Sequence, residues 1–148
     1  MGETDAFLET MMARYRDAET ALHNGDAAPR KDMWARTAPV TLLGAAFSAT
    51  GWQEIEPIFD RLQASFSKCT SCEHDVVAAG ASGDLAYIVA FERTTASVNG
   101  SPSLPYTLRA TTVFRREDGE WKVVHRHADP VASEDAAELV QRLVATDV

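Results

Sequence analysis

Histidine is the side chain best suited to moving a proton near neutral pH. The sequence has four histidines, His23, His74, His125 and His127. His127 lies at the end of an apolar run that favours a strand, and Asp129 follows closely enough to orient its imidazole ring. We therefore predict His127 and Asp129 as catalytic candidates. The alternative for His125 and His127 is hydrogen bonding at an interface or at the rim of a sheet. His23 ends a predicted helix, where the helix dipole favours a histidine.

Arginines on one face of the predicted sheet give a second candidate site. The alternation along the strands groups Arg93 with Phe91 and Arg126 with Ala128, and we expect both rows to lie on the inner face. A guanidinium group in a mostly apolar pocket would bind a carboxylate through two hydrogen bonds, so these residues favour an acidic small ligand. In the alternative, the two arginines reach water at the rim or pair with Glu56, Asp60 or Glu92.

Cysteines are few, and their spacing does not define a metal site. Cys69 and Cys72 form a single C-x-x-C motif, whereas a structural zinc site needs four ligands. We expect two loop cysteines before a strand, with a labile local disulfide as the alternative. The sequence has no P-loop, no nucleophile-elbow motif, no zinc-protease motif and no dinucleotide-binding glycine pattern, so we predict neither a metal nor another cofactor.

The composition bounds the class of protein. The chain has 148 residues and a formal net charge of −8, which suits one domain and disfavours nucleic acid as a partner. No apolar run approaches the ~20 residues that cross a membrane, and the acidic N-terminus does not resemble a secretory signal. With only two cysteines, we expect a cytoplasmic protein, no membrane contact and a single domain over residues 1–148.

The hydrophobic pattern indicates helices first and strands afterwards. Apolar residues recur at helical spacing over residues 4–23, a short helix opens at Pro29, and a third helix follows Gly51. Strands are predicted at 40–43, 74–80, 83–95, 105–117 and 120–128, with a C-terminal helix at about 133–146. This order predicts an α+β fold, with helices packed on one face of an antiparallel sheet.

Both faces of the predicted sheet are substantially apolar, whereas a sheet with one wet face alternates more cleanly. The inner, pocket-facing side is predicted to carry Tyr87, Val89, Phe91, Arg93, Leu108, Ala110, Thr112, Phe114, Val124, Arg126 and Ala128. The outer side is predicted to carry Ala86, Ile88, Ala90, Glu92, Arg109, Thr111, Val113, Arg115, Trp121, Val123, His125 and His127. Because helices cover only one face, a second copy of the chain is the simplest cover for the other. We therefore predict a homodimer formed through the outer sheet face.

The stretch Thr111–His127 resembles the C-terminal hairpin of SnoaL-like proteins in the nuclear transport factor 2-like superfamily. The segments His23–Asp26, Val40–Gly44 and Gly83–Tyr87 fit the same family, so the resemblance covers residues 5–130. It implies a cone of three helices packed on a strongly curved antiparallel sheet, with a pocket inside and dimerisation outside. The predicted C-terminal helix is extra to that pattern. Members include ketosteroid isomerases, polyketide cyclases, dehydratases and a kinase association domain, so the fold does not identify an activity.

The resemblance also allows one activity to be tested residue by residue. A ketosteroid isomerase needs a carboxylate base and a carboxylic acid at the oxyanion, and those places fall at Gly44 and near Thr112. Steroid isomerisation is therefore not expected, although Thr112 could still donate a hydrogen bond. Tyr15 is the candidate for the family's phenol, about one turn away from its usual place.

A ligand pocket in this fold would need a lining. The residues predicted to bind a ligand are Tyr15, Trp34, Trp52, Phe59, Tyr87, Phe91, Arg93, Thr112 and Arg126. Aromatic residues at these spacings are more often plain core, which is the alternative. The sequence thus predicts a homodimer that binds a small apolar or weakly acidic molecule. Any isomerase, cyclase or dehydratase chemistry would rest on His127 with Asp129, or on Tyr15. The alternative function is a ligand-free association module.

Overall fold

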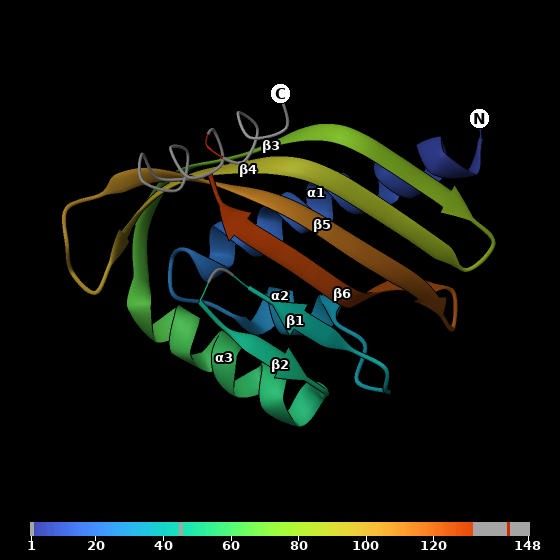
Figure 1. Ribbon diagram of the computed structural model, residues 1–148, viewed down its shortest axis with the longest axis horizontal. Helices are drawn as coiled ribbons and strands as arrows, with labels where there is room; N and C mark the ends of the chain where they lie inside the picture. The colour runs from blue at the N-terminus through green and yellow to red at the C-terminus, as the bar shows by residue number, and fades with distance from the viewer. Residues whose placement is uncertain (1, 45, 132–141, 143–148) are drawn as a thin grey trace.

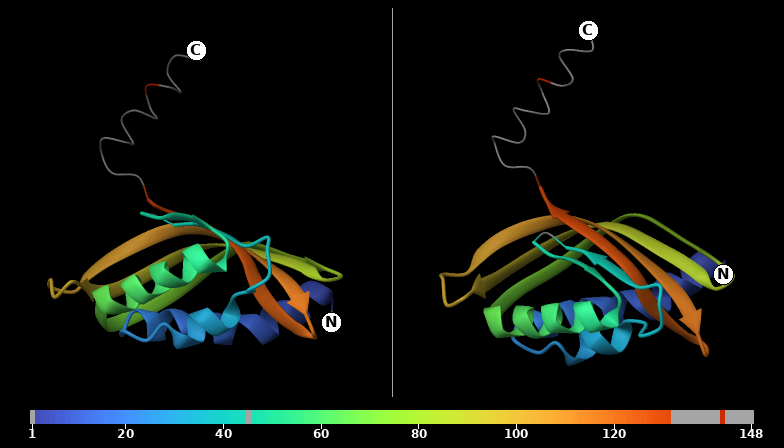
Figure 2. Two further views of the ribbon diagram at one scale, coloured as in Figure 1. Left: turned by 90° about the horizontal axis from the view of Figure 1, so that it is seen from below. Right: turned by 60° about the horizontal axis from the view of Figure 1, so that its bottom comes forward.

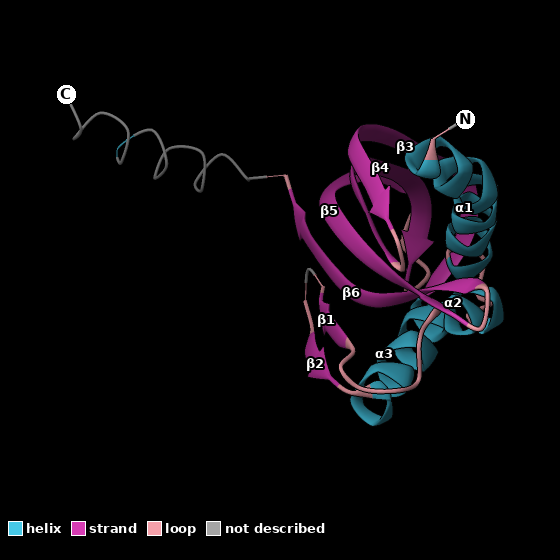
Figure 3. Cartoon of the chain, turned by 90° about the vertical axis from the view of Figure 1, so that its right-hand side faces the viewer, coloured by secondary structure: helices cyan, strands magenta, loops and turns pink. Residues whose placement is uncertain are grey.

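Helices cover one side of a curved sheet in the computed structural model, which describes residues 2–44, 46–131 and 142 (Figures 1 and 2). The helices are α1 (Glu3–Leu22), α2 (Ala28–Met33) and α3 (Trp52–Ser65). The strands are β1 (Thr41–Leu43), β2 (Ser48–Thr50), β3 (Phe66–Ser82), β4 (Leu85–Val98), β5 (Leu104–Glu117) and β6 (Glu120–Pro130). The predicted α+β cone is confirmed, and Figure 3 shows the strands curling around the helical side. The predicted C-terminal helix lies outside the described residues.

The sheet has the strand order β2-β1-β6-β5-β4-β3. Its long strands are antiparallel neighbours, as predicted, but β1 runs parallel to β6 and makes the sheet mixed. The strand β2, which pairs with β1 in an antiparallel hairpin, was not predicted from the sequence. A strand of three residues is too short to show a period of two, so only its pairing reveals it.

The edge strand β3 begins eight residues earlier than predicted, directly after α3. Cys69 and Cys72 therefore lie in a strand and not in the predicted loop, and both are free thiols. This half of β3 is polar and irregular, with a shift in register between Ser67 and Ser71 and a positive φ of 54° at Lys68. Pairing with β4 holds it in the sheet where its own hydrophobic pattern gives no strand signal.

The faces of β4 are the reverse of those predicted. Ile88 pairs with Thr112 and Glu92 pairs with Leu108, so the row with Ala86 and Ala90 faces the helices. Its inward members Ala86, Ile88, Ala90, Glu92 and Thr94 are all buried. The bulkier Tyr87, Val89, Phe91 and Arg93 lie on the outer face instead. The alternation groups these side chains correctly, but alternation alone does not say which row faces the helices, and the row predicted to face inward lies outside.

A β-bulge accounts for a second difference. The register between β5 and β6 shifts after Val113 pairs with His125, and Phe114 then pairs with Val123. One extra residue, Val124, reverses the alternation of β6 at this point. Trp121 and Val123 consequently belong to the core and not to the outer face as predicted, whereas His125 lies outside as predicted. Arg126 and Ala128 face inward, also as predicted.

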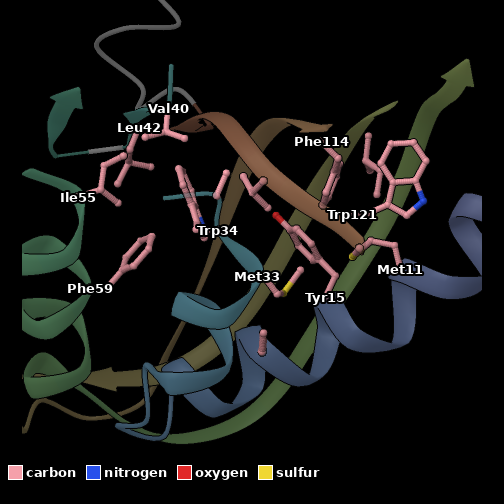
Figure 4. Packing of buried hydrophobic residues seen from close by; sticks show 14 of the residues in the cluster. Met11, Tyr15, Met33, Trp34, Val40, Leu42, Ile55, Phe59, Phe114 and Trp121 are labelled. Carbon is pink, nitrogen blue, oxygen red and sulfur yellow. The ribbon is translucent and has the colours of Figure 1, made fainter. Parts of the chain in front are cut away.

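The core has two parts joined at Trp34 (Figure 4). The first part forms where the apolar stripe of α1 meets β5 and β6, with Phe7 edge-on to both Phe114 and Trp121 at 5.1 Å. The second lies under α3, where Phe59 packs edge-on against Trp34 at 5.4 Å. No helix among the described residues combines the length and the apolar composition that a membrane crossing requires. Next to the part of the core under α3, the side chains leave a cavity.

Candidate functional site

A cavity of about 340 Å³ opens between α3, the β1–β2 hairpin and the inner face of β4–β6. This volume is at the lower end of the range for small-molecule sites, about 300–1,000 Å³. Most of its wall is apolar and comes from Leu22, Leu42, Phe47, Ile58, Leu62, Phe66, Val98, Leu108, Ala128 and Pro130. Its polar members are Glu19, His23, Arg30, Glu92, Thr94, Tyr106 and Arg126. The cavity therefore combines apolar walls with a convergent polar cluster.

Arg126 and Glu92 form a buried ion pair in that cluster. Arg126 Nη2 lies 2.5 Å from Glu92 Oε1, and Nη1 lies 2.9 Å from Oε2. Burial alone would raise the pKa of Glu92, but the charge and hydrogen bonds of Arg126 outweigh it and hold the pKa at about 2. Burial would likewise lower the pKa of Arg126, and Glu92 raises it instead. Both groups are therefore fully ionised at neutral pH.

Tyr15 completes this pair from α1. Its hydroxyl donates to Glu92 Oε2 at 2.8 Å and accepts from Arg126 Nη1 at 2.6 Å. Since the Tyr15 proton is engaged with Glu92, the Thr112 hydroxyl 3.2 Å away can donate to the Tyr15 oxygen. Burial raises the pKa of Tyr15 to about 12. Tyr15 and Thr112 thus position Arg126 but do not line the cavity.

A second buried ion pair joins Glu19 of α1 to Arg30 of α2. Burial, followed by the charge of Arg126, lowers the pKa of Arg30 to about 10, so the side chain stays protonated at neutral pH. The guanidinium also lies over the Phe59 ring, 5.5 Å from its centroid. Neither residue was predicted. Glu19 occupies a stripe position of α1, four residues after Tyr15, and a charge on an apolar stripe was the available signal.

His23 and Tyr106 provide the groups in the cavity best suited to proton transfer. His23 Nδ1 lies 2.7 Å from the backbone carbonyl oxygen of Glu19. Because a carbonyl only accepts, Nδ1 carries the hydrogen and Nε2 presents a lone pair. The Tyr106 hydroxyl donates to that lone pair. Burial lowers the pKa of His23 to about 4 and raises that of Tyr106 to about 12, so both are neutral at neutral pH.

His74 of β3 does not line the cavity, and its ring stands edge-on to Tyr15 with the ring centroids 5.0 Å apart. Both of its ring nitrogens are buried with no hydrogen-bond partner among the described residues. Burial lowers the pKa of His74 and keeps the ring neutral. The described residues hold no group of three or more His, Cys, Asp or Glu side chains arranged to bind a metal.

The predicted catalytic pair lies on the other side of the sheet. His127 Nε2 is 2.9 Å from Asp129 Oδ2, but both side chains are half exposed on the outer face and neither lines the cavity. The strand β6 continues to Pro130, so no turn carries His127 to the pocket. Arg93 also points outward and pairs with Asp75 of β3.

The other predicted ligand-binding residues are scattered. Tyr87 and Phe91 share the outer face with Arg93, Trp34 and Phe59 are buried core residues, and the Arg36 guanidinium covers Trp52. Of the nine, only Arg126 lines the cavity, and it pairs with Glu92 as the alternative interpretation allowed. Gly44, where the resemblance places a steroid isomerase base, also lines the cavity.

The model of a SnoaL-like domain family matches residues 11–133. Solved structures with the same fold include a candidate dehydratase of the nuclear transport factor 2-like family from Streptomyces avermitilis. It is 20% identical with a TM-score of 0.68, over 87% of this chain and 99% of that one. A related protein of unknown function from Pseudomonas putida is 20% identical with a TM-score of 0.69, over 88% and 89%.

A third structure with this fold is a candidate association domain of calcium/calmodulin-dependent protein kinase type II from Thiobacillus denitrificans. It is 16% identical with a TM-score of 0.64, over 82% of this chain and 95% of that one. No curated protein sequence matches the chain. The structural likenesses show the fold alone, whereas the family model spans most of the chain. Together with the cone and its cavity, that match shows that the chain belongs to the SnoaL-like domain family.

Proposed function

We propose that the cavity binds a small, mainly apolar molecule and that His23 and Tyr106 move a proton on it, in isomerase- or dehydratase-type chemistry. The observation that carries this proposal is a neutral imidazole whose lone pair accepts the proton of a phenol, on the wall of an apolar cavity. A general base needs contact with the substrate and an unprotonated form at working pH. His23 is unprotonated at neutral pH, and it would reach a bound molecule through Tyr106.

The proton route follows from the hydrogen bonds. Tyr106 gives its proton to His23 Nε2 while its oxygen takes one from the bound molecule, so no free phenolate accumulates. The cation formed on His23 is stabilised by the Glu19 carboxylate, whose Oε2 lies 4.0 Å from Nδ1. Return of the proton to another carbon completes an isomerisation, and its return to a departing hydroxyl completes a dehydration. The fold shared with a candidate dehydratase agrees with the second outcome.

The test is hydrogen–deuterium exchange next to the carbonyl of small ketones in heavy water, followed by NMR. The wild-type protein should accelerate the exchange, and His23→Gln should lose about 10²–10⁴-fold of the acceleration. His127→Gln is the matched control and should leave the rate unchanged. The proposal fails if the His127 variant, and not the His23 variant, abolishes the exchange.

We also propose that the outer sheet face joins two copies of the chain. On β4, Tyr87 is 43% exposed there in one row with the half-buried Val89 and Phe91, and Leu43 of β1 is 40% exposed on the same face of the sheet. Apolar side chains gathered on one face are typical of an interface between subunits. Light scattering at micromolar concentration should give a dimer that Tyr87→Asp dissociates. Leu104→Asp, which changes an exposed residue off that face, should not dissociate it.

A ligand-free association module is the second candidate function, favoured by the fold shared with a candidate kinase association domain. A dimer with no exchange activity toward any ketone would support it. The free thiols of Cys69 and Cys72 suit a reducing compartment, and we propose the cytoplasm.

A further inference from the structure

The ionised side chains of the cavity are already paired with one another. Glu19 bonds Arg30, and Glu92 bonds Arg126, so two negative and two positive charges cancel within the wall. His23, the other titratable group with a basic nitrogen in the lining, is neutral at neutral pH because burial lowers its pKa to about 4. The polar part of the cavity therefore carries no net charge.

The Arg126–Glu92 pair has little capacity left for a charged ligand. Both oxygens of Glu92 and both terminal nitrogens of Arg126 are used within the pair, and Tyr15 bonds each partner as well. A ligand carboxylate could have its charge neutralised by Arg126 only by displacing Glu92, because one guanidinium cannot balance two carboxylates. That exchange would leave Glu92 ionised and buried without its cation, which is strongly unfavourable.

The hydroxyl groups of the lining are different, because each can donate or accept a hydrogen bond. Tyr106 is bonded to His23 but keeps acceptor capacity on its oxygen, and Thr94 lines the cavity beside it. The Tyr106 oxygen suits a ligand hydroxyl, because its own proton is donated to His23, and the Thr94 hydroxyl suits a ligand carbonyl or hydroxyl. They cannot neutralise a full charge carried into an apolar cavity, and an unpaired charge there is costly.

We propose that the cavity selects uncharged molecules, apolar over most of their surface with one carbonyl or hydroxyl group, and rejects their carboxylate and ammonium counterparts. This inference rests on the proposed function of the cavity as a small-molecule site. It also narrows the class of ligand. The sequence favoured an acidic ligand held by Arg126, whereas the structure favours a neutral ligand held at Tyr106 or Thr94.

The experiment uses matched probes built on benzene, naphthalene and decalin rings. Each ring carries a methyl ketone, a carboxylate or a protonated aminomethyl group, which differ little in shape and fully in charge. Calorimetry or ligand-detected NMR on the wild-type protein should show the best-fitting ketone binding at least about tenfold more tightly than its charged counterparts.

Glu92→Gln supplies the sharper half of the test. The substitution keeps the side-chain shape, removes the negative charge and leaves Arg126 free to bind an anion, so the preference for ketone over carboxylate should fall by about tenfold or reverse. Glu19→Gln frees Arg30 in the same cavity and serves if the first variant does not fold. Asp75→Asn is the matched control, because it breaks the ion pair with Arg93 on the outer face and should leave the preference unchanged.

The outcomes separate the inference from the function beneath it. Equal binding of ketone and carboxylate by the wild-type protein, or an unaltered preference in folded Glu92→Gln and Glu19→Gln, would overturn charge selection while leaving a ligand site. Binding of none of the probes in the cavity would contradict the proposed function itself.

Discussion

Two ion pairs on opposite faces of the sheet have the same chemistry and opposite surroundings. Glu92 and Arg93 are neighbours in sequence, yet Glu92 turns inward to Arg126 and Arg93 turns outward to Asp75. The inner side chains are 7% and 6% exposed, and the outer ones are 48% and 57% exposed. An exposed pair is screened by water, whereas a buried pair must stay together because neither charge is stable alone. The surroundings therefore decide what each pair does.

The histidines repeat the contrast. His127 with Asp129 is visible in the sequence as two residues with one between them, but it lies half exposed on the outer face. His23 and Tyr106 are 83 residues apart, and only the fold brings them together on the cavity wall. Neither His127 nor Asp129 lines the cavity. Proximity in sequence therefore indicated one pair, and the fold places the other pair on the cavity wall, where the proposed proton transfer requires it.

The largest expected effect is the loss of one partner of the inner ion pair. Arg126→Met should lower the free energy of unfolding by about 3–5 kcal/mol, because Glu92 is left buried and charged. Arg93→Met on the outer face should cost about 0–1 kcal/mol. Denaturant unfolding of both variants measures the difference, and equal losses would contradict the contrast between the faces.

A double variant sharpens this prediction. If the cost comes from the unpaired Glu92 charge, Arg126→Met combined with Glu92→Met should be less destabilised than Arg126→Met alone. A double variant that is less stable than the single one would instead assign the cost to lost packing around Arg126.

Acid should act mainly through the inner face. The pKa of His23 falls from 6.5 to about 4 on folding, so between these values the unfolded chain binds a proton that the folded chain does not. Its contribution to stability is fully present above pH 6.5 and is lost as the pH falls to about 4, by up to about 3 kcal/mol. Glu92, whose pKa falls from 4.5 to about 2, adds a further loss between those values.

Denaturant unfolding at pH 7.5, 5.5 and 4.5 measures this loss. His23→Gln should flatten the decline above pH 4.5 but not abolish it, because burial also lowers the pKa of His74. His127→Gln is the control and should keep the decline of the wild type. If the two variants decline alike, His23 is not the responsible group.

The sequence predicted the architecture well because long elements leave periodic traces. The first helix, α1, and the strands β4, β5 and β6 all lie close to where the pattern placed them. The faces were harder, because alternation groups side chains but does not say which group is buried. At β4 the smaller row faces the helices, and at β6 the bulge at Val124 exchanges the rows.

The candidate site was mostly hidden from sequence reasoning for a related reason. Of its polar residues, Arg126 was predicted and Glu92 was named as a possible partner for it, whereas Glu19, Arg30 and Tyr106 were not predicted. Each of these is a buried or half-buried polar residue, whereas a hydrophobic pattern predicts that buried positions are apolar and that polar residues are exposed to solvent. Their partners lie far away along the chain, so only the register of β4 with β5 and the packing of α1 on the sheet reveal the pairing.

The smallest effect tests the support behind the inner pair. Tyr15→Phe keeps the ring in the core but removes the hydroxyl that bonds Glu92 and Arg126, so it should cost about 1–3 kcal/mol of unfolding free energy. Tyr87→Phe makes the same change on the outer face and should stay within about 0.5 kcal/mol of the wild type. Denaturant unfolding compares the two variants. If Tyr15→Phe is as mild as Tyr87→Phe, the ion pair holds its geometry without the phenol, and Tyr15 is a core residue and not a positioning residue.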